Sequence, residues 1–100
     1  MRILVARTPE EKATGLLRFD SLPPDTIMIF EDMQEGDVFH MRGMKFGIGI
    51  AAYDEKGNLL KAANLEPGDD VFVAPERTKW VVEGCPDFWK KEVSDELGLA

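Results

Sequence analysis

Cysteine and histidine are almost absent from this chain of 100 residues, which holds one of each, Cys85 and His40. A single cysteine excludes an internal disulfide and any metal site built from several thiolates. A Cys–His nucleophile would require these two distant residues to meet in space. We therefore interpret Cys85 as a small apolar residue near a helix start, with a reactive thiol as the alternative.

Basic residues are too few to balance the acidic ones: 12 Lys and Arg stand against 19 Asp and Glu, for a net charge of −7. This excess of negative charge repels phosphate backbones and anionic lipid headgroups. We therefore expect no nucleic-acid partner and no membrane partner. An acidic surface that only keeps the protein soluble is the alternative meaning of the charge.

Long apolar runs are missing as well. The run at residues 3–6, near the start of the chain, is far shorter than a signal-peptide core or a membrane-spanning helix. On this basis we expect a cytoplasmic location, or incorporation into a particle assembled in the cytoplasm, such as a virion.

Motifs of known chemistry are also lacking. The chain has no Gly-rich phosphate loop, no H-E-x-x-H motif, no nucleophile elbow and no paired-cysteine metal motif. The carboxylates of the loop at residues 31–37 do not have the spacing of a calcium-binding loop, so we interpret this loop as a solvated surface. We predict no metal, no cofactor and no enzymatic activity.

The chain does contain many short apolar and β-branched segments separated by turn residues. The predicted strands cover residues 2–7, 26–30, 38–41, 46–53, 59–65, 71–74 and 79–83. Short strands with frequent turns are typical of a small antiparallel sheet or barrel. We predict one domain over residues 1–100 with an α+β fold: a curved, mostly antiparallel β-sheet or barrel, a short N-terminal helix and a C-terminal helix.

Glycines are found in one turn and on one strand face of this predicted sheet. Gly57, in the turn at residues 54–58, is placed to let the strand at 46–53 pair antiparallel with the strand at 59–65. Within the first of these strands, Gly47 and Gly49 fall on one face. A face of such small residues allows a helix or another backbone to approach closely.

Two helices are predicted from capping signals. Thr8 is a predicted N-cap for residues 9–17, because Pro9 suits the first helical position and Glu11 completes a capping box. The predicted buried stripe of this helix is Ala13, Leu16 and Leu17. The second helix, residues 86–97, is predicted to pack onto the sheet through a repeat of every fourth residue: Trp89, Val93 and Leu97.

Two stretches of the sequence resemble the motifs of a known protein family. Residues 8–22 read T-P-E-E-K-A-T-G-L-L-R-F-D-S-L, and residues 39–54 read F-H-M-R-G-M-K-F-G-I-G-I-A-A-Y-D. They resemble domain of unknown function 192, a family of bacteria, archaea and phages with the motifs A-x-T-x-E-x-x-x-G-L-M-x-R, F-W-M-K-N-T and I-P-L-D-I. The resemblance extends from Ala6 to the segment at residues 80–83, and it implies a small β-barrel fold without an agreed activity.

Several residues of this chain differ from these motifs, and the differences affect which polar side chains are available for a chemical role. The resemblance places the following residues at family positions of a different type: His40 at a Trp, Gly43 and Met44 at Asn-Thr, Gly47 at a Pro and Gly49 at an Asp. If the family's polar cluster has a chemical role, two of its hydrogen-bonding side chains are missing from this chain.

Three residues remain as candidates for ligand binding: Arg18, His40 and Arg42. Arg18 matches the family's Arg only with a one-residue deletion, and Arg42 matches its Lys. Together with His40 they could form a basic patch for a carboxylate, a sugar hydroxyl or a partner's acidic side chain. The alternative is that Arg18 pairs with an acid such as Asp20, while the other two side chains point to solvent.

We therefore consider three functional hypotheses. The first is a non-enzymatic interaction module that docks on a protein partner in a larger assembly, either as a monomer or as a homo-oligomer. A phage capsid that the module decorates or cements is an example of such an assembly. Such a partner is expected to meet an exposed strand edge or an apolar patch rimmed by acidic residues. The second is a protein that binds a sugar or an acidic metabolite. A hydrolase with His40 as general base is the weakest, since the sequence supplies no nucleophile or orienting acid.

Overall fold

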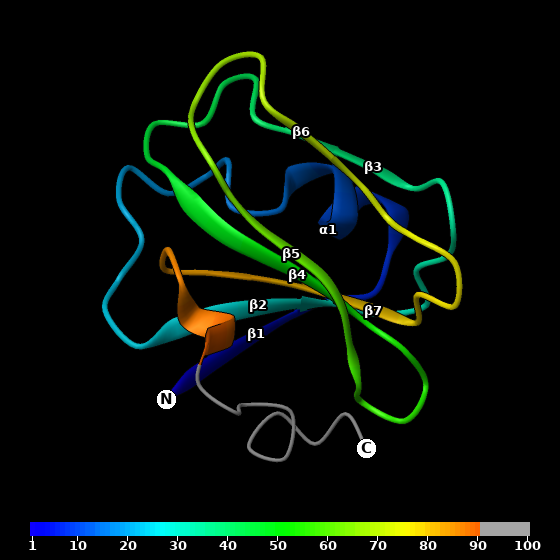
Figure 1. Ribbon diagram of the computed structural model, residues 1–100. Helices are drawn as coiled ribbons and strands as arrows, with labels where there is room; N and C mark the ends of the chain where they lie inside the picture. Colours follow the sequence, from blue (N-terminus) through cyan, green and yellow to red (C-terminus); the bar gives the residue numbers. More distant parts are fainter. Residues whose placement is uncertain (91–100) are drawn as a thin grey trace.

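The computed structural model describes residues 1–90 of the chain and arranges them as two β-sheets with little helix (Figure 1). The larger sheet has five strands in the spatial order β1 (Arg2–Ala6), β2 (Thr26–Phe30), β7 (Trp80–Gly84), β4 (Ile48–Tyr53) and β5 (Leu59–Leu65). The smaller sheet pairs β3 (Val38–His40) with β6 (Val71–Val73). All the predicted strands are present, with ends that shift by up to two residues.

The larger sheet is mixed and it is not closed into a barrel. The pairs β2–β7, β7–β4 and β4–β5 are antiparallel as predicted, but β1 and β2 run parallel. Parallel neighbours need a long crossover connection, and the segment between these two strands, which includes the helix, supplies it. β1 and β5 stay at opposite edges, so the barrel alternative was wrong, and the short helices leave the fold mainly β.

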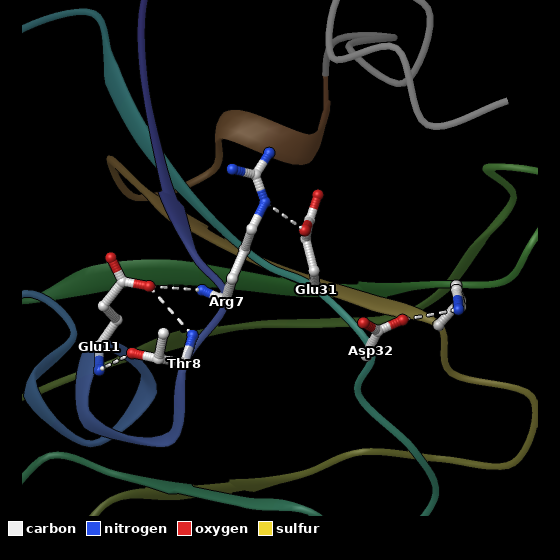
Figure 2. Close-up of polar contacts among 6 residues, drawn as sticks. Arg7, Thr8, Glu11, Glu31 and Asp32 are labelled. Carbon is white, nitrogen blue, oxygen red and sulfur yellow. Dashed lines mark hydrogen bonds and ion pairs between the residues drawn. The ribbon is translucent and has the colours of Figure 1, made fainter.

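The helix α1 (Pro9–Thr14) begins where the capping signals predicted. Thr8 accepts a hydrogen bond at Oγ1 from the Glu11 backbone N–H, and the Glu11 side chain accepts one from the Thr8 N–H, at 3.1 and 3.0 Å (Figure 2). This reciprocal pair satisfies N–H groups that the first helical turn leaves without partners. These bonds to the Thr8 and Arg7 backbone also lower the pKa of the Glu11 carboxyl.

The end of α1 differs from the prediction. The helix stops at Thr14, because Gly15 adopts a φ of 48°, in the left-handed region that favours glycine. Leu16 is still fully buried, and Leu17 half-buried, but both lie in the turn after the helix, and Ala13 is exposed. The predicted helical stripe was therefore wrong for Ala13.

β7 lies at the centre of the larger sheet, and its successive side chains point to two separate apolar layers. Val81 faces the first layer, which contains Phe30, Ile50 and Phe72 and lies beneath the smaller sheet. Val82 faces the second layer, on the opposite side. Figure 1 shows the smaller sheet and the C-terminal 3₁₀ helix on these opposite sides of the larger sheet.

The second layer is covered by the 3₁₀ helix η1 (Phe88–Lys90), whose Phe88 and Trp89 pack against the sheet. This confirms that Trp89 packs inward. The rest of the predicted C-terminal helix, with Val93 and Leu97, lies outside the described residues.

Gly49 allows this close approach. A Cβ at Gly49 would lie 2.6 Å from the backbone oxygen of Cys85 and 2.8 Å from the Trp89 ring. The prediction that small residues on this face admit another segment is thus confirmed at Gly49.

We expect Gly49→Ala to destabilise the protein by about 1–3 kcal/mol, as overpacking of a tight interior does. Gly47→Ala is the matched control, because its Cβ would meet only the end of the flexible Glu66 side chain, at 3.0 Å. The measurement is the urea midpoint of each variant. Equal midpoints for the two variants would show that the contact between Gly49 and η1 does not constrain the fold.

Candidate functional site

The three basic candidates occupy separate places on the surface. Arg18 is exposed in the turn after α1, where its guanidinium carbon lies 4.9 Å from the centre of the Phe19 ring. Its suggested partner Asp20 pairs with Lys45 instead, and this pair lowers the pKa of the Asp20 carboxyl. His40 ends β3, and Arg42 lies in the turn that follows, both exposed.

The cavities separate these residues further. Arg18 lines a cavity beside β1 and α1, whereas His40 lines a second cavity formed by α1, β3 and part of the larger sheet. Arg42 lines neither of them. A joint binding role for Arg18, His40 and Arg42 stays a prediction.

The smaller sheet presents apolar side chains to solvent. Its register places Val38 opposite Val73 and His40 opposite Val71. Val38, Val71 and Val73 are 58%, 57% and 41% exposed. We call these four residues the outer face.

The inner side of the same sheet is aromatic. Phe39 and Phe72, which are paired across the strands, point the other way from the outer face. The Phe39 ring meets Phe30 edge-on at 5.1 Å and Phe72 at 6.5 Å between ring centres. This packing fixes which side chains of β3 and β6 face solvent.

Acidic residues lie at both ends of the outer face. Asp37 comes directly before β3, and Asp69 and Asp70 directly before β6. Because the two strands are antiparallel, these acids lie at opposite ends of the small sheet. Lys61 of β5 adds one cation at the side, where its Nζ donates to the Val73 carbonyl at 3.1 Å.

Glu83 is a functional candidate that the sequence reasoning missed. It lies on β7 opposite Met28 and Ile50, so its side chain points into the first apolar layer, and it is only 7% exposed. Burial raises the pKa of its carboxyl to about 8. One feature of the sequence could have identified it: Glu83 lies two positions after Val81 and therefore on the same face of an otherwise apolar strand.

Glu83 lines the same cavity as Val38, Phe39 and His40 of β3. This cavity has a volume of about 240 Å³ and lies between α1 with its following turn, β3 and β7. Among residues 1–90, no hydrogen bond or ion pair to the Glu83 side chain is formed, and no fully buried side-chain oxygen or nitrogen is left unpaired. The carboxyl oxygens are therefore accessible from the cavity.

The loop at residues 31–37 holds two other acidic groups that are paired with cations. Glu31 pairs with Arg7 at 2.7 Å and Asp32 pairs with Lys79 at 2.8 Å (Figure 2). Within the described part of the chain, no three His, Cys, Asp or Glu side chains are grouped to hold a metal ion.

Among residues 1–90, none of the helices has the length and apolar character needed to cross a bilayer.

The model of the family DUF192, described as "Uncharacterized ACR", matches residues 1–94. A protein of unknown function from Novosphingobium aromaticivorans DSM 12444 is similar in structure, with a TM-score of 0.76 and 24% identity over 100% of this chain and 70% of that one. No curated protein matches the sequence.

A second solved structure is also similar. It is a protein from Sinorhizobium meliloti 1021 named a "putative transcription regulator", with a TM-score of 0.75 and 17% identity over 98% of this chain and 74% of that one. At these identities, both likenesses show the fold alone.

Glu83 makes stability depend on pH in a definite direction. The native state keeps the carboxyl proton up to about pH 8, whereas the unfolded chain releases it near the ordinary value of 4.5. The native state thus binds more protons between these values, so stability falls as pH rises through this window, by at most about 1.4 kcal/mol per pH unit. We expect Glu83→Gln to flatten the curve of unfolding free energy between pH 5 and 8.

The matched control is Glu55→Gln, which changes an exposed glutamate in the β4–β5 turn and should leave the wild-type curve unchanged. Urea unfolding at several pH values measures all three proteins. Parallel curves for wild type and Glu83→Gln would contradict the burial of a titrating carboxyl at this position.

Proposed function

Since the chain belongs to the DUF192 family, whose members are described as uncharacterized, we propose that it is a non-enzymatic interaction module that docks on a larger protein assembly. The observation that carries this proposal is the outer face of the smaller sheet. Three valines lie side by side there, each more than 40% exposed. Contiguous exposed apolar surface of this kind is typical of a protein contact.

The outer face is suited to docking because it is already ordered. Phe39 and Phe72 anchor β3 and β6 from below, so the valines are held in place before a partner arrives. Burying ordered side chains costs less entropy than ordering a loop on binding. Each valine removed from water contributes roughly 1.5–3 kcal/mol when its burial is complete.

The partner is expected to be a different protein with an apolar centre and a basic rim. Asp37, Asp69 and Asp70 lie at the ends of the outer face, and the chain carries a net charge of −7. A second copy would bring like charges together, whereas a basic rim on the partner would be attracted. A capsid shell that the chain decorates or cements is one such assembly.

The packing around Gly49 supports a role without catalytic turnover. The family motif has Asp at this position, but the Cys85 carbonyl and the rings of Phe88 and Trp89 fill the space that a side chain would need. The packing therefore replaces one polar group of the family's cluster with contacts that stabilise the fold.

A nucleic-acid role, as the name of the Sinorhizobium meliloti relative would suggest, has less support. The net charge of −7 opposes contact with a phosphate backbone. One basic side chain beside the outer face is already engaged: Lys61 donates to the Val73 carbonyl and lies over the Phe72 ring.

The double variant Val38→Ser, Val73→Ser tests the proposal. Both side chains are exposed, so we expect the variant to fold with a stability within about 0.5 kcal/mol of wild type. We expect wild type, isolated from the cells or particles that carry it, to be bound stoichiometrically to a protein, and the variant to be released. Sedimentation velocity and quantitative cross-linking of the isolated complex measure this.

Leu59→Ser is the matched control, since Leu59 is 47% exposed but lies on β5, away from the outer face. The control should stay in the complex. Loss of binding in the control, or full retention of the double variant, would contradict docking through the outer face. A wild-type homodimer that the double variant dissociates would overturn the expectation of a different partner.

A further inference from the structure

The cavity beneath the smaller sheet has one polar side chain deep in an apolar wall. Glu83 is 7% exposed and stands between Met28 and Ile50 of the neighbouring strands. None of the described residues gives its carboxyl a hydrogen bond or an ion pair. Burying a carboxyl without a partner costs free energy, so a site that keeps one there favours a ligand that supplies the missing contact.

The rest of the cavity wall suits an apolar or cationic group. Five of the side chains that line it are aromatic or contain a thioether: Phe30, Phe39, Met33, Met41 and Met44. Aromatic faces attract ammonium groups, and methionine adapts its shape to small ligands. The same aromatic cluster already holds an ammonium on its far side, where Lys61 Nζ lies 4.9 Å from the centre of the Phe72 ring.

We propose that the cavity between α1, β3 and β7 binds a small organic amine, whose ammonium group pairs with the Glu83 carboxylate while its apolar body contacts the Phe and Met side chains. The volume of about 240 Å³ lies just below the roughly 300–1,000 Å³ of sites for drug-sized ligands, so the amine is small. The cavity shares Val38 and His40 with the outer face, but its ligand is a small molecule, so this proposal goes beyond the docking role.

Other ligand classes fit the cavity less well. An anion would gain no ion pair with Glu83 in either protonation state of that carboxyl, and Asp37 in the lining offsets the charge of Lys12. A sugar needs many hydrogen-bonding partners, but the strands on either side of Glu83 place only Met28 and Ile50 opposite it. A metal ion needs several ligating side chains, and the described residues bring no such group together.

Binding of an ammonium must release a proton from Glu83. At neutral pH the carboxyl is mostly protonated, because its pKa is about 8. The reaction is R-NH₃⁺ plus Glu83-COOH giving the ion pair R-NH₃⁺·Glu83-COO⁻ plus one proton in solvent. The affinity should therefore rise with pH up to about 8, since only the ionised fraction is competent to bind.

Three other charged or titratable groups line this cavity: Lys12 from α1, Asp37 from the segment before β3, and His40 from β3. The strands on either side of Glu83 present Met28 and Ile50, which do not titrate. Lys12, Asp37 and His40 stay unchanged when Glu83 alone is replaced. Removal of Glu83 therefore separates its effect on pH dependence from theirs.

The test titrates benzylamine into the protein by calorimetry and by two-dimensional NMR at pH 6 and pH 8. We expect wild type to bind benzylamine more than about tenfold more tightly at pH 8 than at pH 6, with proton release at the lower pH. Glu83→Gln should lose at least tenfold in affinity and the pH dependence with it. Glu55→Gln, which changes an exposed glutamate outside the cavity, should bind as wild type does.

Benzyl alcohol and benzoate are the ligand controls on the wild-type protein, and they need no variant to fold. Each should bind at least tenfold more weakly than benzylamine at pH 8. Equal binding of benzyl alcohol would overturn the assignment of an ammonium ligand, and so would tighter binding of benzoate. No NMR shift of cavity residues at millimolar benzylamine, or unchanged binding by folded Glu83→Gln, would overturn the site itself.

Discussion

The structure depends on β7, the central strand of the larger sheet, which joins the two halves of that sheet. It holds β2, and with it the parallel strand β1, against the β4–β5 hairpin. Because side chains alternate along a strand, β7 also contributes to both apolar layers, with Val81 to one and Val82 to the other. The same alternation directs Glu83 into the first layer, where a carboxyl has few partners.

The smaller sheet contributes to both proposed contacts, because Val38 and His40 of the outer face also line the cavity. Along β3, Val38 and His40 face solvent, while Phe39 points toward the layer that contains the cavity. One two-stranded sheet thus provides an apolar surface for a partner and part of the wall around Glu83. Its acidic ends and the apolar interior beneath it have different chemistry, which is why a protein surface and a small amine can each be matched to one side.

Local signals allowed much of the fold to be predicted from the sequence. The capping box at Thr8 and Glu11 and the strand β2 depend on residues close together in the chain, and both were correct. The parallel pairing of β1, the open sheet and the cavity around Glu83 depend on contacts between distant segments, which periodicity does not encode. Arg18 was chosen from its match to the family motif, and His40 was added to the same basic patch, but the fold places these two residues at different cavities.

The central claim is that β7 holds a protonated carboxyl in the apolar interior. The most direct measurement is the titration of the Glu83 side-chain carboxyl carbon by NMR in the native protein, with Glu83→Gln used to assign the signal. The account predicts a titration midpoint near 8, since burial raises the pKa of this group to about 8. A midpoint near 4.5, the ordinary value for a glutamate, would contradict it.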